Sequence, residues 1–166
     1  MTMTQQWVVF AVATPLQHAV ADLLRKAEKP YKGHINFYAY IRQLYNNKRK
    51  LLLAGLESAG FETLDPEGSF FIMATAKDDQ LLKKPRHYEQ LIERAGMKID
   101  TQSLDYPSYN LSRNLSINNK VTSIPMAAFL SEKNKLSNKA IRFAFCKGDD
   151  ELQQAVSMLS TLNKKQ

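Results

Sequence analysis

The order of the predicted elements places the chain in the mixed α/β class, as a small α+β layer preceded by two helices. Before residue 60, apolar residues recur at the spacing of amphipathic helices, and beyond it the spacing changes to the period of two that is typical of strands. From residue 61 the segments follow the order β, β, α, α, β, β, α. That order suits helices packed on one small sheet.

The first thirty residues predict an arm followed by a helix. Residues 7–12 are bulky and β-prone, which favours an arm or a strand without its partner. Thr14 and Pro15 then form a helix start, with the Thr14 hydroxyl as the cap and Pro15 at the first helical position. Lys29 and Pro30 end this helix, which carries one apolar stripe.

A second helix is expected from about residue 35 to residue 59. Its apolar residues recur at helical spacing, and Gly60 is a natural left-handed cap at its carboxyl end. A helix of this length is long for a globular protein. Such a length is typical of a helix that connects two domains.

The remaining elements are shorter and alternate in type. The turn at residues 65–68 joins two strands, and acids in the first turn of the last helix favour its amino end. We expect strands at 61–64, 69–74, 121–124 and 140–146, and helices at 86–95, 107–117 and from 149 onward.

Composition indicates a globular chain and narrows its partners. The hydrophobic share of 44% and the charged share of 23% are ordinary for a folded domain. The net charge of +7 raises the question of nucleic acid, but the basic residues are scattered among acids and are not interleaved with aromatic residues. A solvated basic surface is therefore predicted, with no nucleic-acid partner.

Compartment and membrane association follow from two further features. Cys146 is the single cysteine, which excludes an internal disulfide, fits a reducing compartment and is most simply a small core hydrophobe. The apolar run at residues 7–13 is far too short to span a bilayer. We expect a cytoplasmic protein without a membrane partner, although a mitochondrial presequence upstream of Met1 would change that location.

The strand predicted at residues 140–146 contains the main candidate functional residue. Alternation places Ile141, Phe143 and Phe145 on a core face, and Arg142 on the other face among alanines and Cys146. Small neighbours leave room around the guanidinium, whose fork matches a carboxylate. The alternatives are an arginine that pairs with an internal acid and one that simply faces water.

Other chemistry-bearing residues lack a pattern. His18, His34 and His87 lie far apart, without the spacing of a metal site or a catalytic pair, and the six glycines form no phosphate-binding loop. We predict surface or packing roles for these histidines and no metal site.

Four segments occur in an order that is similar to the back half of fold-type-I aminotransferases. They read VVFAVATPLQHAV, KRKLLLAGLESAGFETLDPEGSFFIMA, VTSIPMAAFL and IRFAFCKGDDELQQAVSML. The resemblance is closest to the kynurenine and methionine aminotransferase group and covers nearly the whole chain except about residues 77–106. It implies the C-terminal small domain of that fold, preceded by an arm and a long interdomain helix.

The resemblance also implies roles for two residues. In the family, the arginine at the IRFAF position binds the α-carboxylate of the amino-acid substrate, which assigns that role to Arg142. The aromatic residue of the VVFAVATP block, here Phe10, resembles one that reaches the partner subunit's active site. An ordinary interface or core aromatic is the alternative for Phe10.

The sequence departs from the family at the catalytic lysine. Relatives carry the lysine that forms the Schiff base with pyridoxal phosphate upstream of the VVFAVATP block, and this chain begins too late to include it. No lysine here, Lys77 included, lies in a matching context. The phosphate-binding turn, the aromatic that stacks on the cofactor and the aspartate that pairs with its ring nitrogen are also missing. Pyridoxal phosphate is therefore not expected to bind stably to this chain alone.

These features predict three parts and two competing functions. Residues 1–30 are a remnant of the large cofactor domain, residues 31–60 a linker helix, and residues 61–166 the small domain. The chain is expected to be a fragment of an enzyme that moves an amino group from a kynurenine, methionine, glutamine or aromatic amino acid to a 2-oxo acid, inactive on its own. The alternative is a non-catalytic interaction protein. A homodimer, or docking onto a full-length relative, is the expected assembly.

Overall fold

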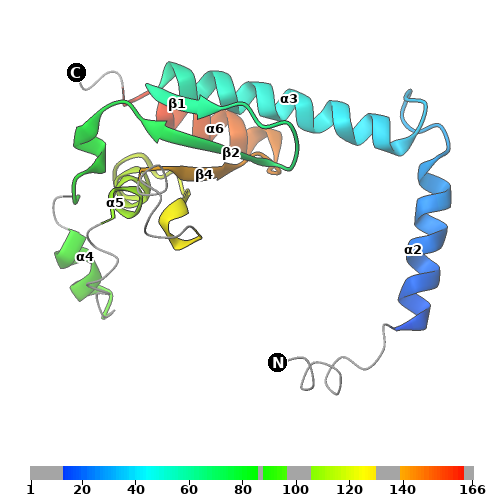
Figure 1. Cartoon of the computed structure of the whole chain (residues 1–166), viewed down its shortest axis with the longest axis horizontal. Coiled ribbons are helices and arrows are strands. Elements are labelled where there is room, and N and C mark those ends of the chain that lie inside the picture. The colour runs from blue at the N-terminus through cyan, green and yellow to red at the C-terminus, as the bar shows by residue number, and fades with distance from the viewer. Residues whose placement is uncertain (1–12, 86–87, 97–105, 130–138, 163–166) are drawn as a thin grey trace. The chain divides into compact units, whose positions relative to one another are not determined.

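The computed structural model describes residues 13–85, 88–96, 106–129 and 139–162 (Figure 1). The chain divides into two compact units, Met1–Leu44 and Tyr45–Gln166. Phe10 and most of the arm predicted for the amino end lie outside the described residues.

The first unit contains helix α2, which spans Thr14–Ala27. The expected stop near Lys29 is confirmed, but the expected cap is wrong. Ala13 occupies the cap position without a side-chain hydrogen bond, and Thr14 is already helical. The Ala13 carbonyl instead accepts hydrogen bonds from the backbone of Leu16 and Gln17. The apolar stripe of α2 is exposed, with Leu16 64% and Leu23 63% accessible.

Helix α3 spans Phe37–Ser58, close to the predicted bounds. Gly60 follows it with φ of +86°, the left-handed conformation that the sequence predicted for the cap. The Gly60 amide donates to the Glu57 carbonyl at 3.1 Å, which closes the end of the helix.

The second unit contains a four-stranded antiparallel sheet in the order β1-β2-β4-β3. The strands are β1 (Phe61–Leu64), β2 (Phe71–Ala76), β3 (Ile124–Pro125) and β4 (Ile141–Ala144). The predicted β1–β2 pair is confirmed. The strand predicted for 121–124 is mostly wrong, because the Val121 amide donates back to the Leu115 carbonyl and Lys120 adopts a left-handed φ of +58°. That backbone finishes a helix, which leaves only two residues to pair with β4.

Further helices accompany the sheet in this unit besides the end of α3. Helix α5 (Pro107–Asn114) continues through a π-helical turn at Leu115–Asn119, and helix α6 spans Asp149–Leu159. Helix α4 covers Tyr88–Arg94, and short 3₁₀ helices lie at Asp79–Leu82 and Met126–Ala128. The Gly148 amide donates to the Glu151 carboxylate at the start of α6, as the acidic first turn of this helix suggested.

Helices α3 and α6 cover one face of the sheet, which is where the hydrophobic core lies (Figure 1). The core draws its buried residues from both helices, from the strands and from α5: Leu52, Leu56, Phe61, Ile72, Leu111, Ile141, Phe143, Leu152 and Leu159. The two helices approach closely at Gly55. A β-carbon built there would lie 2.5 and 2.8 Å from the two methyl carbons of Val156.

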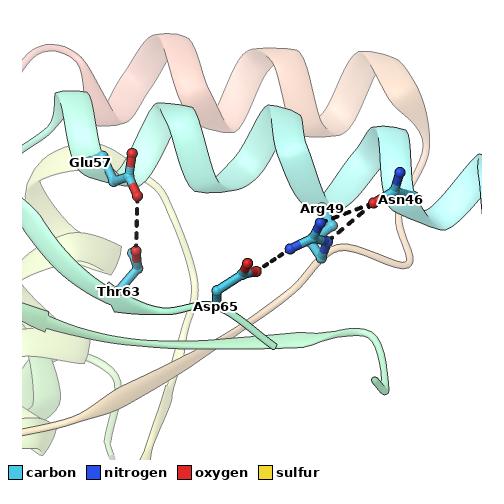
Figure 2. A network of polar contacts seen from close by, with 5 residues as sticks. All are labelled: Asn46, Arg49, Glu57, Thr63 and Asp65. Carbon is cyan, nitrogen blue, oxygen red and sulfur yellow. Dashed lines mark hydrogen bonds and ion pairs between the residues drawn. The ribbon is translucent and has the colours of Figure 1, made fainter. Parts of the chain in front are cut away.

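Polar contacts also join α3 to the sheet (Figure 2). The Arg49 guanidinium forms an ion pair with Asp65, just beyond β1, and donates to the Asn46 side-chain oxygen at 3.0 Å. Within β1 itself, the Thr63 hydroxyl donates to Glu57 at 3.3 Å. The contacts with Asp65 and Thr63 thus tie β1 and the residue after it to α3, while the contact with Asn46 lies within the helix.

Candidate functional site

Arg142 occupies the middle of a row of side chains that crosses all four strands. Cross-strand pairing joins Leu64 to Met73, Met73 to Arg142 and Arg142 to Ile124. Directly paired residues of an antiparallel sheet project to the same face. The row is therefore three apolar side chains with one guanidinium among them.

Among the described residues, this face of the sheet is more exposed than the face that packs against α3 and α6. Leu64 is 65% exposed, Ile124 40% and Met73 37%, whereas Ile141 and Phe143, which point the opposite way from β4, are almost fully buried. The predicted alternation along this strand is confirmed. Arg142, which is half-buried, thus belongs to the more exposed face of the sheet as far as the described residues show it.

Two aromatic rings contact the guanidinium of Arg142. Its central carbon lies 4.1 Å from the ring centroid of Phe71 and 5.1 Å from that of Phe129. Among the described residues, no acid forms an ion pair with Arg142 and no acceptor reaches its Nε, which is buried. An internal acid, one of the alternatives for this arginine, therefore does not come from the described part of the chain.

The space that the sequence suggested around Arg142 is partly filled. Phe71 pairs directly with Ala144, two positions along β4 from the arginine, and its ring uses the room that this small residue leaves. Sequence reasoning missed Phe71 and Phe129. Alternation alone gives the face of each residue, but the register between β2 and β4 is needed to make Phe71 a diagonal neighbour of the arginine.

The prediction that Cys146 is a core residue is wrong. Its side chain is exposed, whereas the neighbouring Phe145 is buried in the core. The alternation of buried and exposed residues along β4 therefore continues past Ala144 and places Cys146 on the more exposed side.

The other sequence candidates gather at no common site. His18 lies on α2 and His34 in the loop before α3, while His87 lies outside the described residues. No group of three potential metal ligands occurs in the part of the chain that the structure describes. A cavity of about 430 Å³ opens beside α6 and is lined by Lys120, Phe143, Lys147, Glu151 and neighbouring residues. Arg142 does not line it.

The fold has clear counterparts among known proteins. The profile of the family described as aminotransferase class I and II matches residues 2–109. The kynurenine–oxoglutarate transaminase of Dictyostelium discoideum is 34% identical over 97% of this chain and 34% of that protein. The crystal structure of Bna3p from Saccharomyces cerevisiae superposes with a TM-score of 0.75 at 27% identity, over 96% of this chain and 34% of that one. N-succinyldiaminopimelate aminotransferase from Mycobacterium tuberculosis gives a TM-score of 0.63, also at 27% identity, over 95% and 33%.

A mixed helical fold with a small antiparallel sheet, together with these matches, defines an aminotransferase fold, as predicted. The chain belongs to the class I and II aminotransferase family. It spans about a third of the length of the relatives that it matches.

Pyridoxal phosphate is the cofactor of this family, but the residues around Arg142 do not fit it. The row across the sheet offers one guanidinium and three apolar side chains, and the groups placed against that guanidinium are phenylalanine rings. Within the described residues this face supplies no amine for a Schiff base. A guanidinium is instead a group that pairs with carboxylates.

Within the described residues, no helix is both long and apolar enough to cross a membrane.

Proposed function

We propose that this chain supplies the substrate-carboxylate arginine, Arg142, of an aminotransferase. The enzyme would transfer an amino group from a kynurenine, methionine, glutamine or aromatic amino acid to a 2-oxo acid. One observation carries the proposal: the half-buried guanidinium on the more exposed sheet face has no carboxylate partner among the described residues. The likeness to a kynurenine–oxoglutarate transaminase supports the choice of reaction.

Arg142 would act by binding and orientation. A half-buried guanidinium pairs with a carboxylate through two parallel hydrogen bonds, which fixes both the position and the direction of the bound acid. Each charged hydrogen bond contributes about 1.5–3 kcal/mol. The amino-group chemistry itself belongs to the cofactor.

In this proposal the chain is a fragment of the enzyme and is inactive alone. Residues 1–30 would be the remnant of the cofactor domain, 31–60 the linker helix and 61–166 the small domain, with Phe10 close to a partner subunit's site. Without the Schiff-base lysine the chain lacks the chemistry itself, and would not hold pyridoxal phosphate stably. A cytoplasmic location and a homodimeric enzyme complete this proposal.

A titration of the purified chain with pyruvate tests the role of Arg142. We expect NMR shifts that saturate with a Kd on the order of 1–10 mM, since 1 mM corresponds to about −4.1 kcal/mol. Uncharged pyruvamide is the matched control ligand and should not bind. Arg142→Met should weaken pyruvate binding at least tenfold, because it removes charged hydrogen bonds of about 1.5–3 kcal/mol each. Equal affinity of the wild type and Arg142→Met would refute the role.

Inactivity is tested separately, with pyridoxal phosphate and borohydride. We expect labelling to be spread over surface lysines and no turnover of amino acid. A reduced adduct at one lysine, together with transaminase activity, would contradict the proposal. The genomic sequence upstream of Met1 tests the proposal that the chain is a fragment. An in-frame continuation that encodes a Ser/Thr-x-x-Lys turn supports this proposal, and an in-frame stop codon argues against it.

One observation favours a second function, a non-catalytic interaction protein. The apolar stripe of α2 is exposed along its length, including Leu16, Val20, Leu23 and Leu24. Single exposed apolar residues are ordinary, whereas a continuous stripe marks a contact surface. In this reading α2 docks onto a full-length relative. Light scattering of the wild type and of Leu16→Glu/Leu23→Glu with such a relative separates the two functions, since only docking predicts a complex that the double variant loses.

A further inference from the structure

The rings beside Arg142 are placed by the sheet and not by the core. Phe71 stands opposite Ala144 on β2, so that its ring reaches diagonally over the guanidinium. Phe129 follows the 3₁₀ helix Met126–Ala128, which the sheet holds in place through the Met126 amide and the Ala140 carbonyl, 3.0 Å apart. Phe129 is 60% exposed, so its ring contributes little to the core and its described contact is with the arginine.

The guanidinium is accessible on one edge only. A guanidinium offers a carboxylate two forked edges, one formed by Nε with one Nη and the other by both terminal Nη atoms. Nε of Arg142 is buried and has no acceptor among the described residues. The terminal nitrogens also lack a protein partner there, but they are not among the buried unpaired atoms and therefore meet solvent. The free edge is the terminal one.

The two rings and the burial of Nε restrict the same property, the orientation of the Arg142 guanidinium. Ring faces attract a cation, and they do so most strongly where water is excluded. With rings at 4.1 and 5.1 Å, the guanidinium has little freedom to turn its Nε edge toward a ligand. We propose that Phe129 and Phe71 are positioning residues that hold Arg142 so that a substrate carboxylate meets only its two terminal nitrogens. This inference rests on the proposed function of Arg142 as the carboxylate-binding residue.

The test uses the whole chain, labelled with ¹⁵N in its arginine side chains, and pyruvate as the probe. Arg142→Met identifies the Arg142 Nε–H resonance by removing it. We expect this resonance to exchange slowly with water and to shift when Phe129 is replaced by leucine. On addition of pyruvate the terminal nitrogens should shift while the Nε–H resonance stays nearly constant. A large downfield shift of Nε–H on binding would overturn the inference.

Variants of Phe129 give the second readout. Because this ring is exposed, Phe129→Leu should leave the backbone spectrum intact and weaken pyruvate binding about two- to fivefold, the range that about 0.5–1 kcal/mol of cation–π attraction implies. Phe129→Tyr keeps a ring face and should bind as the wild type does. The matched control is Tyr38→Leu, which removes an exposed ring in the first unit and should change nothing.

The outcomes separate this inference from the proposed function. If the wild type binds pyruvate, Arg142→Met does not, and Phe129→Leu binds as tightly as the wild type, the inference alone is overturned. If the wild type itself fails to bind pyruvate, the proposed function is overturned and the inference falls with it. Two results together support the inference and the proposed function. Phe129→Leu should bind pyruvate more weakly while Phe129→Tyr binds it as the wild type does. The Nε–H resonance of the wild type should stay unchanged when pyruvate is added.

Discussion

Replacing Gly55 by alanine tests whether the close approach of α3 and α6 fixes the core. The added β-carbon would lie 2.5 and 2.8 Å from the two methyl carbons of Val156. Carbon atoms prefer separations of about 3.5–4.0 Å, so the helices must separate by roughly 1 Å or Val156 must change rotamer. Overpacking of this kind costs about 1–3 kcal/mol.

The higher helix propensity of alanine partly offsets the cost of overpacking. Alanine is favoured over glycine inside a helix by about 1 kcal/mol. Because both methyl carbons are too close, we take the upper part of the overpacking range and expect Gly55→Ala to lower the free energy of unfolding by about 1–2 kcal/mol. Urea unfolding followed by circular dichroism measures this, with an unchanged m-value as the sign that only stability has changed.

A double-mutant cycle assigns the loss to the contact. Val156→Ala removes the two methyl groups that clash, so Gly55→Ala should cost less in that background, with a coupling of about 1 kcal/mol or more. The matched control is Gly68→Ala, where a β-carbon meets no atom within 4 Å and stability should be almost unchanged. If Gly55→Ala is as stable as the wild type, or if its cost is the same in the Val156→Ala background, the helices are not held by this contact.

Three further changes probe other parts of the second unit. Asn114→Ala should cost about 1–3 kcal/mol, because the Asn114 amide donates at 2.8 Å to both the Leu81 and the Lys83 carbonyls and each bond contributes about 0.5–1.5 kcal/mol; a urea midpoint equal to that of the wild type would contradict this. Lys48→Met should cost about 0.5–1 kcal/mol, since Lys48 pairs with Asp149 at 3.2 Å from a largely buried position. That difference should shrink at about 1 M salt, and a salt-independent loss would argue against the ion pair. A chain of residues 45–166 should unfold at nearly the same urea concentration as the full chain, because every residue of the core cluster comes from this unit; a clearly lower midpoint would show that residues 1–44 stabilise it.

Local rules predicted the long elements of the fold well. Helix α3 and the left-handed conformation of Gly60 at its end were both predicted. Both depend only on residues close together in the sequence: a repeating apolar pattern and a glycine just after it. The alternation of Ile141, Arg142 and Phe143 was also predicted, since it needs only the period of a strand.

Wrong predictions arose at the ends of helices, where backbone hydrogen bonds decide which residue begins or ends the helix. Thr14 is helical because the turn begins at Ala13, whose carbonyl accepts the first helical bonds. Val121 closes the helix that precedes it and so leaves β3 short. Each outcome depends on hydrogen bonds that no periodic pattern in the sequence specifies.

Phe71 shows the same limit at the candidate site. From the sequence, Phe71 is a bulky residue in a predicted strand. Only its pairing with Ala144 shows that it lies next to Arg142. Register is a relation between two segments, and β2 and β4 lie far apart in the sequence. The rings at the site therefore became evident only from the structure.

Stability and proposed function lie on opposite faces of one sheet, because adjacent residues of a strand point in opposite directions. Ile141 and Phe143 pack under α3 and α6, and Arg142 between them projects from the face where Leu64 and Met73 are exposed. Burying a charge is costly unless an anion meets it. Arg142 has no acid partner among the described residues, which fits its place on the more exposed face. The same alternation that buries Ile141 and Phe143 thus places Arg142 on the more exposed face, beside the rings of Phe71 and Phe129.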